Sequence, residues 1–313
     1  MELVGLAEIQ AAAEGLAGVA TRTPVVEFPG LPGFGLKLEQ LQPVGAFKLR
    51  GAYHAISLIP AERRVKGVIT HSSGNHGQAV AYAARELGIP AVVVMPHDSV
   101  PLKIDRVRER GAEVVLVPVA ERQSAAERLA AERDLTFVPP YDHPDVIAGQ
   151  GTVGLEIVAQ VPDVEVVLVP VGGGGLISGV AAAVKAVRPS AKVIGVEPEL
   201  AADARDSRRA GTRVEWPVEQ RVRTVADGLR GAVGELTLRH IIALVDDIIT
   251  VSEDEIRATV GELARRADVT AEPSGAVATA GYLHRRTELP EGRTVAVVSG
   301  GNIDPELLRT LVP

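Results

Sequence analysis

EVVLVPVGGGGLISGVAAAVKAVRPSAKVIGV, residues 165–196, contains a complete strand–loop–helix–strand unit. Residues 165–169 and 192–196 are short, β-branched runs of the kind that form buried strands. The segment between them has apolar residues on one helical stripe: Leu176, Val180, Val184 and Val187. A strand followed by a helix and a second strand predicts a parallel sheet with helices on both of its faces.

The same alternation continues on both sides of this unit. Residues 78–87 have apolar side chains at helical spacing, and Gly88 then provides a stop signal. Between about residues 67 and 137 the strand candidates lie closer together, which predicts a small four-stranded α/β unit. The chain is therefore expected to have an α/β fold with the strands 67–70, 91–95, 113–117, 165–169, 192–196 and 294–298.

Composition excludes several classes of function. The 313 residues carry a net charge of −7 and 3% aromatic side chains, which argues against a nucleic-acid or membrane-surface partner. No apolar run approaches the roughly 20 residues of a membrane span, and no signal peptide is apparent. Cysteine is absent, which rules out disulfides and thiolate chemistry and fits a cytoplasmic protein.

Three glycine-rich loops follow predicted strands, where parallel sheets bind their ligands. They are HSSGNHG at 71–77, VGGGG at 171–175 and SGGN at 299–302. Four glycines in a row let several backbone amides converge on one anion at the start of a helix, so a phosphate is expected there. Two alternatives remain open. The glycines could serve only close packing, or the loop could belong to a nicotinamide-dependent oxidoreductase with Glu197 on the ribose.

Lysine is scarce in this chain, with six lysines against 27 arginines. A lysine is ordinarily a solvated surface charge, but Lys48 stands between Phe47 and Leu49. Two large apolar neighbours favour partial desolvation of its amine. Desolvation lowers the pKa of an amine and makes it a better Schiff-base former. The candidates for such an amine are Lys37, Lys48, Lys66, Lys103, Lys185 and Lys192.

Four ordered motifs resemble the fold-type II pyridoxal-phosphate enzymes, in particular the threonine/serine dehydratase and serine racemase group. The motifs are QPVGAFKLRGA (42–52), SSGNHGQA (72–79), VPVGGGG (169–175) and SGGN (299–302). The resemblance implies a two-lobed, tryptophan synthase β-like fold and a homodimer. It places a large cofactor-binding domain at residues 1–53 plus 146–313. A small domain at 54–145 would carry the loop for the substrate carboxylate.

The resemblance also assigns roles to residues around the cofactor, pyridoxal 5′-phosphate. Lys48 would hold the cofactor as an imine, and Phe47 would line the ring pocket. Ser299 would contact the pyridine nitrogen; a neutral hydroxyl there makes a weaker electron sink, which suits elimination or racemisation. Asn75 would bind the 3′ oxygen, while the phosphate would lie on the amides of Gly172, Gly173, Gly174 and Gly175.

The substrate carboxylate would bind the loop formed by Ser72, Ser73, Gly74, Asn75, His76 and Gly77, next to a helix N-terminus near Gln78. Ser73 resembles the group's second acid/base, on the ring face opposite Lys48, although a serine alone is more often a helix cap. His76 is interpreted as a structural residue.

GVEPELAAD, residues 195–203, resembles a divalent-cation site of the same group. Glu197, Asp203 and the carbonyl of Ala201 would bind Mg²⁺ or Ca²⁺ through hard oxygens. Spaced carboxylates are also common on surfaces, and this role for Glu197 excludes the ribose role. One residue departs from the group's pattern: Ala46 stands where a serine usually precedes the Phe-Lys pair, which affects the expected substrate more than the cofactor.

The sequence therefore predicts elimination of water from L-threonine or L-serine, giving a 2-oxo acid and ammonia. Lys48 would remove the α-proton as general base. Racemisation of serine, with Ser73 returning the proton from the other face, is the alternative. 3-Hydroxyaspartate would need a further cationic contact that the sequence does not locate. A nicotinamide-dependent oxidoreductase and a non-catalytic carrier of the cofactor remain as alternatives of other classes.

Overall fold

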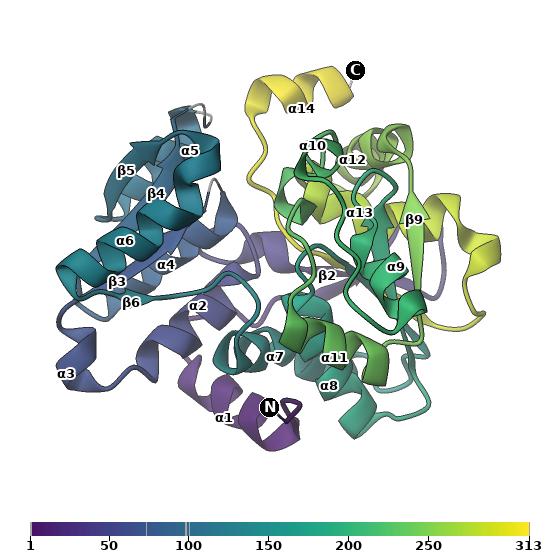
Figure 1. The fold of residues 1–313 in the computed structure, drawn as a ribbon. Helices are drawn as coiled ribbons and strands as arrows, with labels where there is room; N and C mark the ends of the chain where they lie inside the picture. The colour runs from purple at the N-terminus through teal and green to yellow at the C-terminus, as the bar shows by residue number, and fades with distance from the viewer. Residues whose placement is uncertain (1, 73, 98, 100, 313) are drawn as a thin grey trace.

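A computed structural model describes residues 2–72, 74–97, 99 and 101–312 (Figure 1). The described strands form two sheets, of six and four strands. The strands are β1 (Val25–Glu27), β2 (Phe34–Leu38), β3 (Val68–His71), β4 (Ala91–Pro96), β5 (Glu113–Val117), β6 (Thr136–Phe137), β7 (Val166–Pro170), β8 (Lys192–Pro198), β9 (Asp247–Val251) and β10 (Thr294–Val298).

Helices connect most of these strands. The described α-helices are α1 (Leu6–Gly15), α2 (Lys48–Ser57), α3 (Ala61–Arg64), α4 (Asn75–Glu86), α5 (Pro101–Glu109), α6 (Arg122–Arg133), α7 (Pro144–Gln160), α8 (Gly175–Val187), α9 (Asp203–Ala210), α10 (Val218–Arg221), α11 (Glu235–Leu244), α12 (Glu253–Ala267), α13 (Pro273–His284) and α14 (Pro305–Leu311). Short 3₁₀ turns add η1 (Glu39–Leu41), η2 (Val119–Glu121), η3 (Asp227–Leu229) and η4 (Arg286–Glu288).

The six-stranded sheet has the order β1-β2-β10-β7-β8-β9 and is parallel except for the antiparallel pair of β1 and β2. Alternate residues of its strands face opposite layers, as the pleat requires. On β7, Val167 and Val169 pack against α7, α8 and α11, whereas Val166 and Leu168 pack against α12 and α13. Helices thus cover both faces, which explains why β7 is apolar at every position.

The four-stranded sheet has the order β5-β4-β3-β6 and all of its strands are parallel. Helices α2, α4 and α5 cover one face, where Val68 and Val93 are buried. Helix α6 covers the other face through Ala126 and Leu129. This sheet and its helices form the left-hand part of Figure 1.

The predicted α/β fold and the four-stranded unit are confirmed. Strands 113–117 and 294–298 have the predicted bounds. Two other candidates are shifted by one residue, and the remaining two extend one or two residues further at their C-terminal end. Helix α4 begins at Asn75 rather than near Gln78, so this part of the prediction is wrong. The predicted domain boundaries at 53/54 and 145/146 fall inside α2 and α7. The division into two domains at these positions stays a prediction.

Both sheets contain a point at which the strand order reverses. In the six-stranded sheet the chain proceeds from β7 to β8 and β9, and then returns to place β10 on the other side of β7. In the four-stranded sheet it proceeds from β3 to β4 and β5, and then places β6 on the other side of β3. Ligands of parallel sheets bind at such switch points. The fold therefore predicts a site where the ends of these four strands meet.

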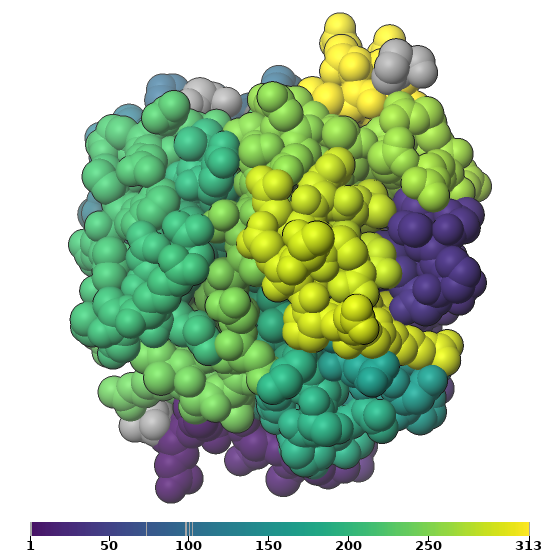
Figure 2. Space-filling model, turned by 90° about the vertical axis from the view of Figure 1, so that its right-hand side faces the viewer, coloured from purple at the N-terminus to yellow at the C-terminus, as the bar shows by residue number. Residues whose placement is uncertain are grey.

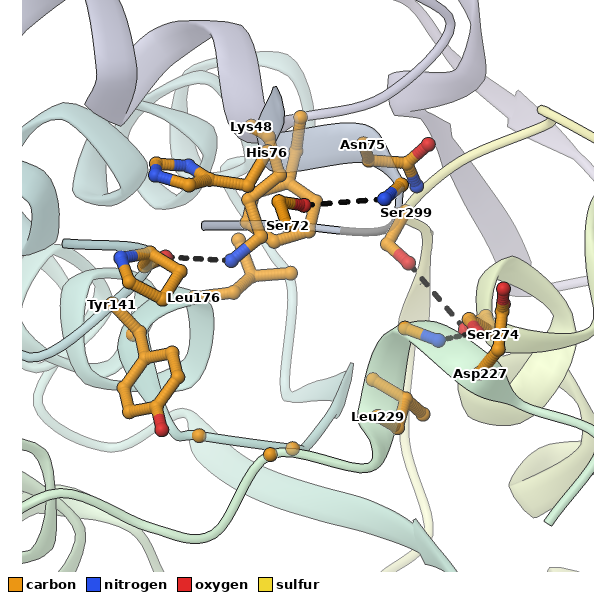
Figure 3. A pocket seen from close by; sticks show the side chains of 18 of the residues that line it. Lys48, Ser72, Asn75, His76, Tyr141, Leu176, Asp227, Leu229, Ser274 and Ser299 are labelled. Atoms are coloured by element: carbon orange, nitrogen blue, oxygen red, sulfur yellow. Dashed lines mark hydrogen bonds between the residues drawn. The ribbon is translucent and has the colours of Figure 1, made fainter. Parts of the chain in front are cut away.

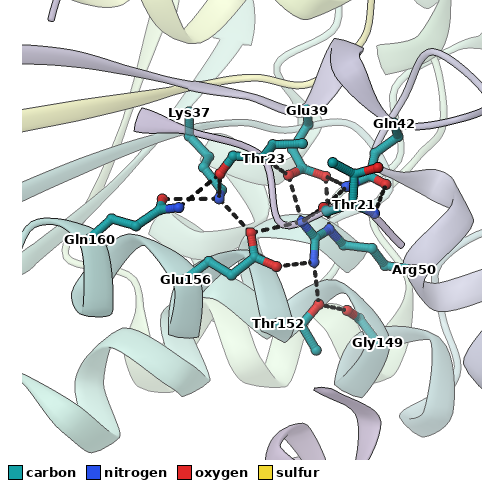
Figure 4. Close-up of polar contacts among 10 residues, drawn as sticks. All are labelled: Thr21, Thr23, Lys37, Glu39, Gln42, Arg50, Gly149, Thr152, Glu156 and Gln160. Atoms are coloured by element: carbon teal, nitrogen blue, oxygen red, sulfur yellow. Dashed lines mark hydrogen bonds and ion pairs between the residues drawn. The ribbon is translucent and has the colours of Figure 1, made fainter. Parts of the chain in front are cut away.

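A buried ion network joins α2 to the six-stranded unit (Figure 4). Arg50 of α2 donates from Nε and Nη2 to Glu39 at 2.8 Å each, and from Nη1 to Oε1 of Glu156 on α7 at 2.7 Å. Lys37 of β2 donates to Oε2 of Glu156 at 2.5 Å. The Lys37, Glu39 and Arg50 side chains are almost fully buried. The two cations and two carboxylates balance in charge, as buried ions require.

The two termini lie on opposite sides of the molecule in Figure 1, but segments near the two ends of the sequence meet in the six-stranded sheet. Figure 2 shows segments coloured purple and yellow side by side on one face, in agreement with the pairing of β2 and β10. Within the described part of the chain, no helix is long and apolar enough to cross a membrane.

Candidate active site

A cavity of about 200 Å³ lies at the two switch points (Figure 3). All four strand ends contribute to it: Ser72 and Asn75 follow β3, Pro140 and Tyr141 follow β6, the glycine loop follows β7 and Ser299 follows β10. The cavity therefore brings together the three glycine-rich loops and Lys48. Its other lining residues are Phe47, His71, Gly74, His76, Lys103, Arg122, Pro170, Leu176, Asp227, Gly228, Leu229, Gly231, Glu272 and Ser274.

Lys48 is the first residue of α2 and extends into this cavity. Its Nζ donates to the carbonyl of Pro140 at 2.7 Å and lies 5.1 Å from the centroid of the Phe47 ring. No carboxylate pairs with Lys48 among the residues that the structure describes. Burial in the protein, with no compensating anion, lowers the pKa of Lys48 to about 8. The amine can therefore be deprotonated near neutral pH, as a Schiff-base lysine requires.

The glycine loop leads from β7 into α8, and Gly174 at its end has a φ of +88°. A Cβ at Gly172 would lie 2.8 Å from the backbone of Leu229, and one at Gly173 would lie 2.5 Å from the Tyr141 ring. Close packing therefore does need these glycines. Within the described residues, the amides of Gly172 to Gly175 donate no hydrogen bond to the protein. Free amides at a helix N-terminus suit a phosphate, so close packing does not exclude a phosphate-binding role for this loop, and that role stays a prediction.

The loop after β3 carries the predicted substrate contacts. The amide of Gly74 donates to Oγ of Ser72 at 3.2 Å, and both residues line the cavity. Gly77 allows α4 to approach β4, because a Cβ there would lie 2.9 Å from Val93. Ser73, the predicted second acid/base, lies outside the described residues.

His76 also lines the cavity, and its Nε2 lies 3.1 Å from the carbonyl oxygen of Val138. Burial, reinforced by the positive charge of Lys48, lowers the pKa of His76 to about 3. The imidazole is therefore neutral, and its ring nitrogen holds the loop against the segment that follows β6. This geometry agrees with the structural role predicted for His76.

Ser299 and Asn75 lie on the same side of the cavity (Figure 3). Ser299 Oγ donates to the carbonyl of Ser274 at 3.4 Å, and its own carbonyl accepts the amide of Phe47 at 3.1 Å. That backbone bond fixes the start of α2, and thus Lys48, beside the end of β10. Ala46 forms a bridge with Gly300 and is not among the residues that line the cavity.

Sequence reasoning missed two acidic and two basic residues that line the cavity. Lys103 forms an ion pair with Asp227, which lies beside Glu272. Burial and the charge of Asp227 raise the pKa of Glu272 to about 7. Arg122 has a buried Nε without a hydrogen-bond partner among the described residues. No local pattern in the sequence marks any of them as part of a site.

The predicted metal ligands lie elsewhere, at the end of β8 and the start of α9. Glu197 accepts the amides of Ala204 and Arg205 at 3.1 and 2.8 Å. Asp203 accepts the amide of Val233 through Oδ2, while its buried Oδ1 has no partner among the described residues. Burial and the neighbouring Asp203 raise the pKa of Glu197 well above its usual value.

No group of three or more acidic, histidine or cysteine side chains suited to a metal is found in the part of the chain that the structure describes. A cation at Glu197 and Asp203 would therefore need main-chain oxygens, such as the carbonyl of the buried Ala201, and water. The metal site stays a prediction.

Comparison with known proteins defines the class. Residues 16–300 match the family described as pyridoxal-phosphate dependent enzyme. The chain belongs to this family, which the lysine, the glycine cradle and the two-sheet fold also fit. Because the chain belongs to the pyridoxal-phosphate family, the alternative prediction of a nicotinamide-dependent oxidoreductase is wrong.

Individual relatives are similar over nearly the whole chain. L-threo-3-hydroxyaspartate ammonia-lyase of Saccharomyces cerevisiae is 42% identical over 88% of this chain and 85% of its own length. L-threonine ammonia-lyase of Geobacter sulfurreducens is 43% identical over 90% of this chain and 70% of its own length. The solved structure of maize serine racemase has a TM-score of 0.94 at 36% identity, and the match covers 99% of this chain and 97% of that one.

Proposed function

We propose that this chain is an ammonia-lyase that converts L-threonine or L-serine into a 2-oxo acid and ammonia. The observation that carries the proposal is Lys48, an amine that pairs with no carboxylate of the described residues, in a cavity that also contains the glycine loop, whose amides bond to no described residue. Pyridoxal phosphate supplies the electron sink that lets the α-proton leave. Relatives named as ammonia-lyases of threonine and 3-hydroxyaspartate support the reaction type.

The chain's own residues would perform the remaining tasks. Lys48 would bind the cofactor covalently and then accept the α-proton of the substrate, for which its lowered pKa suits it. The amides of Gly172 to Gly175 would hold the cofactor phosphate, Phe47 would line the ring pocket, and Ser299 would contact the ring nitrogen. Ser72, Gly74, Asn75, His76 and Gly77 would form the loop that receives the substrate carboxylate, with Ser73.

Arg122 favours a second substrate class, the 3-hydroxyaspartates. Its guanidinium lines the cavity, and burial lowers its pKa while no carboxylate of the described residues pairs with it. The Arg122 side chain is partly buried and its Nε is shielded from solvent, so this partly desolvated cation would gain from a ligand that supplies an anion. The second carboxylate of 3-hydroxyaspartate would be that anion, and threonine and serine have no such group.

A substrate panel tests the proposal. Purified protein with pyridoxal phosphate would be incubated with L-threonine, L-serine, D-serine and L-threo-3-hydroxyaspartate, and 2-oxo acid, ammonia and enantiomers would be measured. We expect 2-oxo acid and ammonia in equal amounts, and borohydride trapping of the cofactor on Lys48. Inversion of serine as the main reaction would favour the racemase alternative, which depends on Ser73. Label on another lysine would disprove the proposal.

The Arg122→Met variant separates the substrate classes. We expect it to lose activity on 3-hydroxyaspartate by about tenfold or more while activity on threonine changes little. Equal losses on both substrates would show that Arg122 does not recognise a second carboxylate.

The homodimer, the cytoplasmic location and the Mg²⁺ or Ca²⁺ site remain predictions. Light scattering would test the homodimer.

A further inference from the structure

Four side chains form a hydrogen-bonded row that leads out of the cavity to α5. Glu272 Oε1 accepts from Asn75 Nδ2 at 2.5 Å, and Asn75 Oδ1 accepts from Asn302 Nδ2 at 2.8 Å. Asn302 Oδ1 in turn accepts from Arg106 Nη1 at 3.0 Å. Glu272 and Asn75 line the cavity, whereas Asn302 and Arg106 do not.

The row has one direction, because Arg106 can only donate. A guanidinium has no acceptor, so the side-chain oxygen of Asn302 must face it. The two N–H bonds of Asn302 then point to two acceptors, the carbonyl of Val44 at 2.8 Å and Oδ1 of Asn75. The Asn302 amide is therefore held in one orientation by an obligate donor on one side and an obligate acceptor on the other.

The orientation of Asn75 follows from that of Asn302. Because the oxygen of Asn75 already accepts from Asn302, its NH₂ group must point toward Glu272 and the cavity. One of the two N–H bonds reaches Glu272; the second meets no acceptor among the described residues, so it is available to an acceptor in the cavity. The 3′ oxygen of pyridoxal phosphate is such an acceptor.

We infer that Arg106, acting through Asn302, is a positioning residue that keeps the NH₂ group of Asn75 turned toward the cofactor; this rests on the proposed role of Asn75. The row also passes three times between the two sheets. Arg106 and Asn75 belong to helices of the four-stranded unit, while Asn302 follows β10 and Glu272 precedes α13. The orientation of Asn75 therefore depends on how the four-stranded unit packs against the six-stranded unit.

Reversing the polarity at position 106 tests the inference. In Arg106→Glu a carboxylate replaces the guanidinium, so an acceptor replaces the donor. The carboxylate would either repel the oxygen of Asn302 or accept a hydrogen bond from its NH₂ group, which would turn the amide over. The readouts are the pH dependence of the two absorption bands of the bound cofactor, which report protonation of its 3′ oxygen, and the affinity for pyridoxal phosphate. We expect a changed band ratio and about tenfold weaker binding. Arg106→Lys still donates and should remain close to the unchanged enzyme.

Arg108→Glu is the matched control, because it makes the same charge change on α5 at an exposed side chain that pairs with Asp105. It should leave the spectrum unchanged. If Arg106→Glu does not fold, Arg106→Met removes the donor without adding an acceptor and should change the band ratio in the same direction, by less.

The outcomes separate this inference from the proposed function. An Asn75→Ala spectrum that changes while the Arg106 variants stay like the unchanged enzyme would overturn the inference alone. If the spectra of Asn75→Ala and Arg106→Glu are both unchanged, Asn75 does not contact the 3′ oxygen of the cofactor. The inference about Arg106 would then be wrong as well. Failure of borohydride to label Lys48 would instead overturn the proposed function.

Discussion

Two lysines inside the protein stand in contrasting surroundings: Lys37 is fully buried, whereas Lys48 is half-buried and lines the cavity. Lys37 donates to Glu156 at 2.5 Å, to the carbonyl of Thr23 at 2.5 Å and to Gln160 at 3.2 Å. Lys48 donates only to the carbonyl of Pro140 among the described residues. Burial lowers the pKa of both amines, but Glu156 and Glu39 oppose the change at Lys37 and no carboxylate does so at Lys48. The comparison indicates that the carboxylate partner, rather than the degree of burial, separates an amine held as a cation from one that can lose its proton near neutral pH.

The largest effect is expected from replacing Lys48. Lys48→Ala should abolish covalent attachment of pyridoxal phosphate and lower kcat by at least about 10³-fold, since it removes both the anchor and the base. Removing a desolvated cation that pairs with no carboxylate of the described residues should leave stability unchanged or raised. Loss of the borohydride-stable label and the steady-state rate on L-threonine would measure this. If Lys48→Ala kept a substantial fraction of the activity, Lys48 would not be the catalytic amine, and the functional contrast with Lys37 would be wrong.

Lys37→Met should have the opposite profile. It leaves Glu156 and Glu39 with only Arg50, so the buried network carries a net negative charge. Breaking a buried ion pair on one side costs roughly 3–5 kcal/mol, which urea unfolding would detect. The borohydride label should stay on Lys48, and kcat of the folded protein should change little. Loss of the label at unchanged stability would contradict the comparison.

The contrast also shows what the sequence could reveal. The motif around Lys48 is compact and recognisable, and the strand pairs beside it are apolar runs. Strand β2 was missed because it reads FGLKL, with a lysine that is buried only through Glu156, 119 positions away. Strands β1, β6 and β9 are short or flanked by charges. The partners of β6 and β9 lie far away in the chain, whereas β1 pairs with the next strand, β2.

The same reason limits prediction of the site. Lys48, Asn75, Ser299 and the glycine loop each follow a strand or begin a helix. Local patterns pointed to the loops and to Lys48, and the family resemblance then assigned Asn75 and Ser299. The acid Glu272 and the cation Arg122 reach the cavity only because distant segments fold together. No local pattern distinguishes them from the exposed charges of the chain, and their importance follows from burial without a full set of partners.

The unpaired state of Lys48 should also appear in the pH dependence of stability. Its pKa in the folded protein is about 8, below the ordinary 10.5 of the unfolded chain. Between these values the unfolded state binds more protons, so the free energy of unfolding should rise with pH from about 8 to 10.5. Denaturant unfolding of cofactor-free protein, compared with Lys48→Met, isolates this contribution. If both proteins show the same rise, Lys48 is not the group that titrates.

Glu197 and Asp203 resemble Lys48 in that burial disfavours their charged forms. They are two buried carboxylates close to one another, and their negative charges repel. Burial raises the pKa of both, and the charge of Asp203 adds to the effect at Glu197. A divalent cation would relieve this repulsion, so Ca²⁺ or Mg²⁺ in excess should raise Tm by on the order of 3 °C. Because protons compete for the same oxygens, the rise should be smaller at lower pH.

Asp203→Asn should remove the response to the cation, whereas Glu199→Gln, at an exposed carboxylate two positions from Glu197, should keep it. Thermal melting with and without the cation, with chelator as reference, measures both variants. An equal rise of Tm in the two variants would mean that the cation acts elsewhere on the acidic surface. If the cation raises Tm in neither variant and not in the unchanged protein, no cation binds at Glu197 and Asp203. Protonation and the backbone amides of α9 would then be sufficient to stabilise the two carboxyl groups.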